Sequence, residues 1–294
     1  MNPDSILPLL EETLSRETGR SYRISSSRSL SGGCIHDARR LEGADGRTFF
    51  VKLNHREHLP GFEAEAFALA QIAATRTLRV PRPIATCADE DIAALVLENL
   101  PLEHSRNPDW ARLGRELAQL HRCTGKDFGW PRDNWIGSSP QKNKWHQSWP
   151  EFYADCRLRP QITWAREKGL RLARGDQLLE ALPCFFQDAQ TLPSLLHGDL
   201  WSGNAAFLED GTPVVFDPAS SYGDRETDLA MTEMFGGFPP AFYSAYRAEW
   251  PLNEGYSRRR DLYLLYHVLN HYLIFGGSYG TQAERIVDQL LPAS

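Results

Sequence analysis

Residues 195–204 read Leu-Leu-His-Gly-Asp-Leu-Trp-Ser-Gly-Asn, and this stretch decides the fold. Asp199 and Asn204 stand five positions apart in a glycine-containing loop that lies between two apolar runs. The second run, 205–208, leads through an Asp-Gly turn to a strand-like run that ends at Asp217. An Asp-Gly pair between apolar runs indicates a hairpin. We therefore expect strand, loop, strand, turn and strand, with Asp199, Asn204 and Asp217 close together at the edge of a small sheet.

Two carboxylates and an amide in this order suit phosphoryl transfer. In that reaction one Asp orients or accepts the proton of the attacking hydroxyl, while an Asn and a second Asp hold magnesium on the nucleotide phosphates. The spacing from Asp199 to Asn204 equals that of the kinase catalytic loop. There are two departures, because Gly198 stands where that loop has Arg, and Pro218 follows Asp217 in place of Phe-Gly. Any one of these residues alone would more simply cap a turn or end a strand, but the three in this order favour a kinase.

An apolar, strand-like run over 48–53 contains a single lysine, Lys52. Upstream of it, Gly32 and Gly33 lie between two further strand-like segments. In kinases a glycine-rich loop covers the nucleotide phosphates, and a lysine on the third strand pairs with them. Each feature also has a simpler interpretation. The glycine pair could form a hairpin turn, and the lysine could be an edge-strand residue that opposes aggregation.

The following helix, expected over 61–74, offers a partner for this lysine. Glu65 falls on the apolar face that begins with Phe62, three residues earlier. A buried carboxylate is costly unless it is paired. We therefore predict a Lys52–Glu65 ion pair of the kind that positions the nucleotide phosphates in kinases. Glu63 is the rival partner, at a more solvent-facing position.

A strand expected over 92–97 runs into the polar segment Glu98-Asn99-Leu100, which Pro101 ends. Such a segment suits a hinge between two lobes, where the backbone around Glu98, Asn99 and Leu100 would hold adenine. An ordinary strand exit is the alternative. The predicted domains are a nucleotide-binding lobe over 1–98, a hinge over 99–101 and a helical catalytic and substrate lobe over 102–294.

From about residue 108 the apolar spacing becomes helical. We expect helices over 152–169 and 175–192, and an irregular segment over 125–150. His121 ends the helix before that irregular segment and is interpreted as structural or solvent-facing rather than as a metal ligand. Downstream of Asp217, Asp228 is a candidate to stabilise the catalytic loop, and Asp224 or Thr227 is a candidate helix cap.

Composition excludes several classes of protein. The 294 residues carry a formal net charge of −6, which argues against nucleic acid as a partner. No apolar run approaches the ~20 residues needed to span a bilayer, and the N-terminus does not resemble a signal peptide. The five cysteines are an odd number without C-x-x-C spacing, which indicates neither a disulfide framework nor a zinc site. We expect a reduced, cytoplasmic protein with no membrane or nucleic-acid partner.

Together these features resemble the fructosamine kinase (ketosamine-3-kinase) family, within the aminoglycoside phosphotransferase and protein-kinase-like superfamily, and its bacterial branch in particular. The resemblance extends over nearly the whole chain. Its most specific feature is Trp201 in the catalytic loop, because related aminoglycoside and choline kinases usually carry another residue there, often His. The other matching stretches are Gly32-Gly33-Cys34, Phe49-Phe50-Val51-Lys52, Phe62-Glu63-Ala64-Glu65, Val80-Pro81-Arg82-Pro83, Pro140-Gln141 with Trp145 and Trp149, Phe216-Asp217-Pro218-Ala219 and Tyr222-Gly223-Asp224-Arg225-Glu226.

The resemblance implies an α+β, protein-kinase-like fold of two lobes. A small N-terminal lobe would contain an antiparallel sheet of five strands and a helix, and the C-terminal lobe would be mostly helical. It also implies the use of ATP and Mg²⁺ to phosphorylate the 3-hydroxyl of a ketosamine, the adduct of a sugar with a free amine or a protein lysine. The phosphorylated adduct then decomposes and regenerates the amine, which is deglycation. Bacterial members are better suited to ribulosamines and erythrulosamines than to fructosamines.

Carried over by position, the resemblance also implies roles for single residues. They are Asp199 as catalytic base, Asn204 and Asp217 as magnesium ligands, Lys52 held by Glu65 on the α- and β-phosphates, Gly32 and Gly33 in the phosphate loop, the backbone of Glu98, Asn99 and Leu100 on adenine, and Trp201 beside the sugar. Cys34 would lie in the phosphate loop. We interpret it as a small buried residue rather than a redox-sensitive thiol, because no second cysteine is near in sequence.

Two other functions stay open. One is a kinase for another small hydroxyl substrate, such as an aminoglycoside, a choline-like alcohol or a free sugar. The other is a pseudokinase that binds without catalysis, which predicts a lost lysine, base or metal ligand, and none is missing here. Trp201 and the sequence Asp217-Pro218-Ala219 favour the ketosamine kinase over a kinase for another hydroxyl substrate, and the pseudokinase ranks last because no such residue is lost.

Overall fold

The computed structural model describes residues 2–30, 36–102, 107–187 and 189–291. The chain divides into two compact units, the first formed by Met1–Pro108 with Ala206–Phe216 and the second by Asp109–Ala205 with Asp217–Ser294. The segment 206–216 therefore belongs to the first unit, although both of its flanks belong to the second. The three-part division with a hinge over 99–101 stays a prediction.

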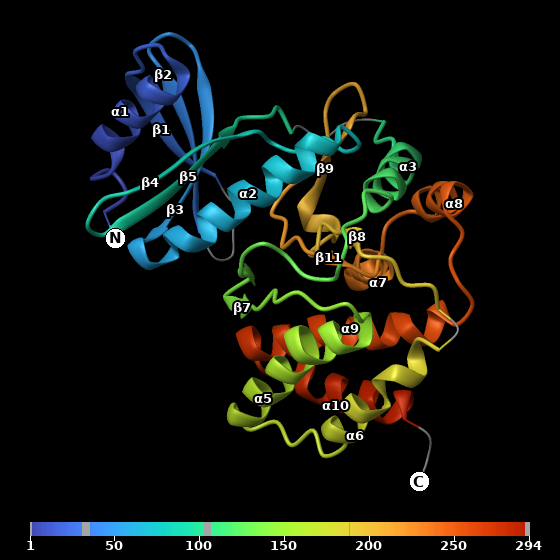
Figure 1. Cartoon of the computed structure of the whole chain (residues 1–294). Helices are drawn as coiled ribbons and strands as arrows, with labels where there is room; N and C mark the ends of the chain where they lie inside the picture. Colours follow the sequence, from blue (N-terminus) through green and yellow to red (C-terminus); the bar gives the residue numbers. More distant parts are fainter. Residues whose placement is uncertain (1, 31–35, 103–106, 188, 292–294) are drawn as a thin grey trace. The chain divides into compact units, whose positions relative to one another are not determined.

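The first unit contains a five-stranded antiparallel sheet in the order β1-β2-β3-β5-β4 (Figure 1). Its strands are β1 (Ile24–Leu30), β2 (Asp37–Gly43), β3 (Thr48–His55), β4 (Pro83–Ala88) and β5 (Ile92–Glu98). Val51 and Leu53 of β3 are buried in one core with Leu10 of α1 (Leu7–Thr18). Because side chains alternate along a strand, Lys52 lies on the opposite face of the sheet. The expected small lobe with five strands is confirmed.

Helix α2 (Leu59–Thr75) follows β3 after a single 3-10 turn and packs against β4 and β5. Pro60 stands in its first turn, where its missing amide hydrogen costs no hydrogen bond. The helix buries an apolar stripe that includes Phe62 and Leu69. A hairpin of β9 (Ala205–Phe207) and β10 (Pro213–Val215) completes the first unit through a parallel bridge between Arg79 and Val214.

The second unit is mostly helical, as expected (Figure 1). Its helices are α3 (Trp110–His121), α4 (Trp149–Tyr153), α5 (Arg159–Glu167), α6 (Gly175–Ala181), α7 (Glu226–Thr232), α8 (Pro240–Glu249), α9 (Tyr256–Phe275) and α10 (Ser278–Leu290). Helix α9 packs against α5, α7 and α10, and its side chains, among them the fully buried Leu262 and Leu269, run through the core of this unit. Helix α3 packs separately against α8.

Two short strand pairs differ from the sequence-based expectation. The segment expected to be irregular contains a hairpin of β6 (Asn134–Ile136) and β7 (Ser139–Gln141). Strand β8 (Ser194–Leu195) pairs with β11 (Tyr222–Gly223) rather than with β9. The single small sheet expected around the catalytic loop is therefore wrong. The loop between β8 and β9 separates these two strands, and the partner of β8 comes from the chain that follows Asp217.

The helix expected over 175–192 is also too long. Helix α6 ends at Ala181 and gives way to a 3-10 turn over Leu182–Phe185. Pro183 explains the early end, because it lacks an amide hydrogen and disfavours an α-helical residue before it. The helix expected over 152–169 begins earlier, at Trp149, and contains a π-helical turn over Ala154–Leu158. Among the helices that the structure describes, none is long and apolar enough to cross a membrane.

Candidate active site

The loop after β8 brings the side chains of Asp199 and Asn204 into direct contact. A 3-10 turn over Ser202–Asn204 folds the loop back. Nδ2 of Asn204 then donates to the backbone oxygen of Asp199 at 2.8 Å and to its carboxylate Oδ2 at 3.2 Å. Asn204 is buried and Asp199 is half-buried. Because the amide nitrogen faces Asp199, Oδ1 of Asn204 is the atom left to bind a cation.

Asp217 lies close enough to Asp199 to affect its ionisation. Desolvation and then repulsion by the Asp217 carboxylate raise the pKa of Asp199 to about 7. Asp217 is itself exposed and has a left-handed backbone, with φ of 59°. This conformation is uncommon for a residue with a side chain, although Asp adopts it more readily than most. The three polar side chains therefore lie together, as expected from their order in the sequence.

Gly198 allows the segment after Asp217 to lie against the catalytic loop. Its φ is +86°, and a Cβ at this position would overlap the carbonyl oxygen of Ala219. The amide of Ala219 donates to the carbonyl of His197 at 2.9 Å. Glycine is required here both for the backbone conformation and for this close approach.

The buried carboxylate of Asp228 stabilises the same loop. Its Oδ2 accepts from the amide of His197 at 2.7 Å, and its Oδ1 accepts from the amide of Gly198 at 2.8 Å. Nε2 of the buried His121 lies 3.1 Å from Oδ2, and Nδ1 of the same ring lies 2.8 Å from the hydroxyl of Tyr246. Burial alone would raise the pKa of Asp228, but the hydrogen bonds and charges of its neighbours, first among them His121, lower the pKa below its ordinary value.

Two sequence-based interpretations are settled by these contacts. Asp228 stabilises the catalytic loop, and His121 is structural rather than solvent-facing. Asp224 has a separate function, because its Oδ1 accepts from the amide of Glu226 at the start of α7.

Sequence reasoning missed a buried polar cluster that contacts Ser220 and Ser221, in the segment that follows Asp217. The guanidinium of Arg157 donates to Oδ1 of Asn143 at 2.7 Å and to Oγ of Ser221 at 3.2 Å. Nδ2 of Asn134 donates to the carbonyl oxygen of Ser220 at 2.8 Å. The asparagines of a tryptophan-rich segment were the available signal, but Ser220 lies 86 positions from Asn134 and Ser221 lies 64 positions from Arg157.

In the first unit, Lys52 and Glu65 form the predicted ion pair. Nζ of Lys52 lies 2.7 Å from Oε1 of Glu65, and the two side chains are only 7% and 13% exposed. Glu63, the rival partner, is exposed. Lys52 also lies opposite Leu95 of β5 and Ala38 of β2, so it is on an interior strand, and the edge-strand interpretation is wrong.

The segment after β5 has side-chain contacts within the first unit. The carboxylate of Glu98 accepts from Arg79 at 2.7 Å and from the amide of Arg82 at 3.1 Å, and Nδ2 of Asn99 donates to Oγ1 of Thr48 at 3.2 Å. Leu100 is half-buried. The expected role of this backbone on adenine stays a prediction. Gly32, Gly33 and Cys34 lie outside the described residues.

The residues present in the second unit fit Mg²⁺. Among the described residues, no cluster of three or more His, Cys, Asp and Glu side chains could hold a metal ion alone. Magnesium in kinases needs no such cluster, because one or two protein oxygens share the ion with nucleotide phosphates and water. Oδ1 of Asn204 and the Asp217 carboxylate are hard oxygen donors of this kind.

Comparison with known proteins shows the family to which this chain belongs. The family model described as fructosamine kinase matches residues 7–293. A probable ketoamine kinase from Synechocystis is 44% identical over 283 residues, which are 96% of each chain. The chloroplastic protein-ribulosamine 3-kinase of Arabidopsis thaliana is 40% identical, over 93% of this chain and 85% of that protein. The crystal structure of a candidate fructosamine-3-kinase from Haemophilus somnus matches with a TM-score of 0.90 at 30% identity, covering 96% of this chain and 97% of the other.

Proposed function

This chain belongs to the fructosamine kinase family and is an ATP-dependent phosphotransferase that acts on a hydroxyl group, and on that premise we propose that its acceptor is the 3-hydroxyl of a ketosamine. Adducts of ribulose or erythrulose with amines or protein lysines are the preferred substrates. The phosphorylated adduct decomposes and regenerates the amine, so the function is deglycation.

One observation carries the assignment of the catalytic residues, namely the contact between Asn204 and the carboxylate of Asp199 in a loop stabilised by Asp228. Asp199 is the general base. Its carboxylate accepts the proton of the 3-hydroxyl as that oxygen forms a bond to the γ-phosphorus of ATP. The bond from the γ-phosphorus to the bridging oxygen breaks, and ADP leaves. Asp199 has the position that the kinase mechanism assigns to the base.

Magnesium, when bound, neutralises charge that develops on the phosphates. Asn204 and Asp217 would hold the ion through side-chain oxygens. In the first unit, Lys52 contacts the α- and β-phosphates, and Glu65 fixes the position of its ammonium group. The backbone of Glu98, Asn99 and Leu100 would hold adenine and Trp201 would flank the sugar, while the role of Gly32 and Gly33 stays a prediction.

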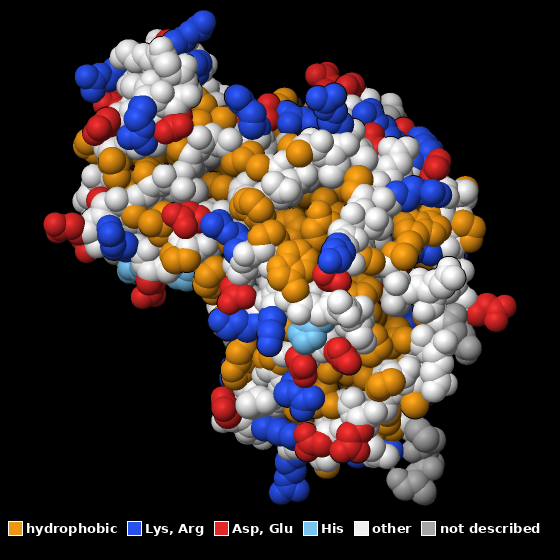
Figure 2. Space-filling model, in the orientation of Figure 1, with side chains coloured by type: hydrophobic (Ala, Val, Ile, Leu, Met, Phe, Trp, Pro, Cys, Tyr) orange, Lys and Arg blue, Asp and Glu red, His pale blue; other side chains and the backbone are white. Residues whose placement is uncertain are grey.

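A cytoplasmic location is supported by the cysteines, since Cys87, Cys123, Cys156 and Cys184 are all free thiols. The absence of a nucleic-acid partner is supported by the net charge of −6. Figure 2 shows acidic side chains among the basic ones over the visible face, where a nucleic-acid surface would be uniformly basic.

The test is ATP consumption in the presence of Mg²⁺ with a panel of acceptors. The panel comprises ribulose-lysine, erythrulose-lysine, fructose-lysine, kanamycin, choline and free ribulose. We expect turnover on the ketosamines, with ribulose-lysine and erythrulose-lysine ahead of fructose-lysine. Turnover confined to kanamycin, choline or the free sugar would contradict the ketosamine assignment while leaving the phosphotransferase assignment in place.

A further inference from the structure

A contiguous row of aromatic side chains extends from the catalytic loop across the second unit. We call it the aromatic row, and it consists of Trp201, Phe235, His271, Phe275 and Tyr279. The ring centroids of Trp201 and Phe235 are 5.5 Å apart, and those of Phe235 and His271 are 5.2 Å apart. His271 then contacts Phe275 at 5.7 Å and Tyr279 at 5.2 Å. The row begins two residues after Asp199.

Two rings of the row are exposed, whereas many aromatic side chains of this unit are buried. Phe235 is 47% exposed and Phe275 is 61% exposed, while Phe152 and Phe242 are fully buried. Trp201, His271 and Tyr279 are half-buried. A contiguous exposed apolar patch on a protein surface marks a binding site more often than chance.

The backbone at Phe235 is strained in a way that keeps its ring at the surface. Its φ and ψ are 54° and 39°, in the left-handed region, and Gly236 and Gly237 follow with φ of 98° and 75°. This conformation is rare for a bulky residue, and such strain gathers at ligand-binding and catalytic sites. Phe238, at the end of the same turn, is buried, so the turn separates an exposed ring from a core ring.

Gly203 fixes the position of the first ring of the row. A Cβ at Gly203 would overlap the indole of Trp201. The indole therefore lies across its own loop, on the side where Phe235 meets it edge to face at an interplanar angle of 67°.

We propose that the aromatic row binds the substituent carried by the amine nitrogen of the ketosamine, a proposal that rests on the proposed function. In a ketosamine this nitrogen is four covalent bonds from the 3-hydroxyl oxygen. With that oxygen at Asp199, the nitrogen lies within roughly 5 Å of it, and Trp201 stands two residues further along the same loop. The later rings of the row continue away from the catalytic loop, as the substituent does.

The chemistry of the row matches this end of the substrate. The nitrogen is a secondary ammonium, and aromatic faces attract such cations. The methylenes of a lysine side chain, or of another extended amine, bury apolar area against the remaining rings. The row therefore selects ketosamines with long or aromatic amine substituents over those with a methyl group.

The experiment measures kcat/KM for two ribulosamines with the same sugar, one made from methylamine and one from hexylamine. For Phe235→Ala and for Phe275→Ala we expect a loss of about tenfold on the hexylamine adduct and less than twofold on the methylamine adduct. Phe235→Leu should restore part of the loss, because it returns apolar area. Melting temperatures show whether each variant is folded.

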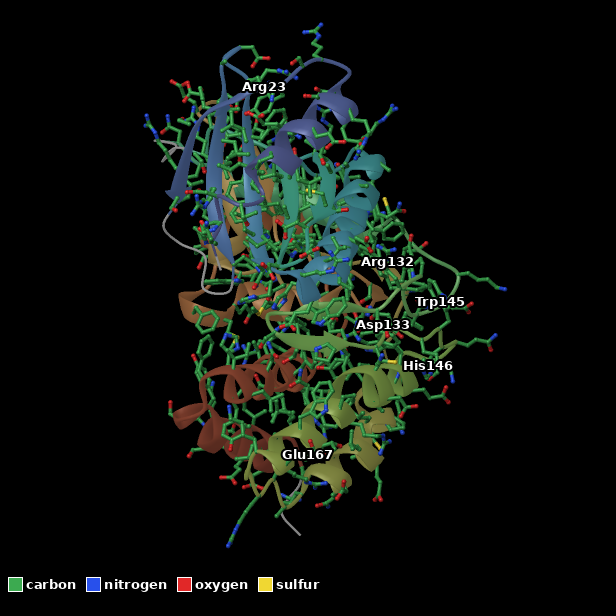
Figure 3. The ribbon with its side chains drawn as sticks, turned by 90° about the vertical axis from the view of Figure 1, so that its left-hand side faces the viewer. Arg23, Arg132, Asp133, Trp145, His146 and Glu167 are labelled. Carbon is green, nitrogen blue, oxygen red and sulfur yellow. The ribbon has the colours of Figure 1, made fainter. Side chains whose placement is uncertain are left out.

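Trp145→Ala is the matched control. Trp145 is 46% exposed, close to the exposure of Phe235, but it stacks on Tyr222 and lies beside Arg132, Asp133 and His146 at the edge of the molecule shown in Figure 3. We expect it to change neither rate. Equal losses on both adducts, or no loss on either, would overturn the role of the row and leave the ketosamine kinase intact. Failure of the unmodified protein to phosphorylate any ribulosamine would overturn both proposals.

Discussion

The carboxylate of Asp228 accepts a hydrogen bond from the backbone amide of His197 at 2.7 Å, although 31 positions separate them in the chain. The same carboxylate accepts from the amide of Gly198 and contacts His121. One buried acid on α7 therefore fixes the two residues that precede Asp199, and the orientation of the proposed base depends on it.

Replacing Asp228 by Asn should impair catalysis more than nucleotide binding. The amide has one oxygen, so its nitrogen would face one of the two backbone donors. We expect kcat to fall by about 10- to 100-fold and the free energy of unfolding to fall by about 2–4 kcal/mol, with the ATP dissociation constant changed less than threefold. Steady-state kinetics, urea unfolding and calorimetric titration measure the three quantities. Asp176→Asn is the control, because that carboxylate is 71% exposed and pairs with Arg166. A normal kcat in a destabilised Asp228→Asn protein would contradict the positioning role.

The same contacts predict an acid-dependent stability. The neighbours of Asp228 lower its pKa in the folded protein below its value in the unfolded chain, which is about 3.9. Its contribution to the free energy of unfolding is therefore complete above about pH 4 and declines as the pH falls through the folded pKa. The difference in that free energy between the unmodified protein and Asp228→Asn should be constant from about pH 7 to about pH 5 and smaller below about pH 4. Urea titrations across this range give the difference, and a difference that grows on acidification would contradict the assignment.

The Lys52–Glu65 pair predicts a graded effect on nucleotide use. Lys52→Met removes the cation that we propose contacts phosphate, so we expect the KM for ATP to rise at least tenfold, with a larger fall in kcat. Glu65→Gln should have a smaller effect, because the lysine remains but is held less firmly. The double variant should lose little more than Lys52→Met, since the two residues act together. Glu63→Gln is the control on the same helix, and an effect of it equal to that of Glu65→Gln would contradict the pairing.

Trp201→Ala tests the contact to the sugar. We expect the KM for ribulose-lysine to rise about tenfold while the KM for ATP stays within twofold, because the proposed contact of the indole is with the acceptor and not the nucleotide. Initial rates with each substrate varied in turn separate the two constants. An unchanged KM for ribulose-lysine would remove Trp201 from substrate binding.

Local chemistry made much of this structure predictable. A lysine in an apolar strand and a glutamate on an apolar helix face each need a partner, so Lys52 and Glu65 could be paired from sequence alone. The order of Asp199, Asn204 and Asp217 implied their proximity because a hairpin separates the last two. These inferences use neighbours in the chain or the cost of burying charge.

The features that were missed depend on long-range packing. Nothing near Asn134 indicates that it contacts Ser220, and the partner of β8 could not be read from the strand itself. Helix α6 ends earlier than the apolar spacing predicts, because Pro183 ends it against that spacing. The aromatic row brings together Trp201, Phe235 and the stretch 271–279. The spacing of apolar residues within any one of these segments does not show that they meet.

The most direct test of the account is phosphoryl transfer to ribulose-lysine by the unmodified protein and by Asp199→Asn, with the phosphate located by ³¹P and ¹³C NMR. We predict phosphate on the 3-oxygen and release of free lysine from the unmodified protein. Asp199→Asn should bind ATP with normal affinity and transfer phosphate at least a hundredfold more slowly. Phosphate on another oxygen, or a rate for Asp199→Asn within tenfold of normal, would contradict it.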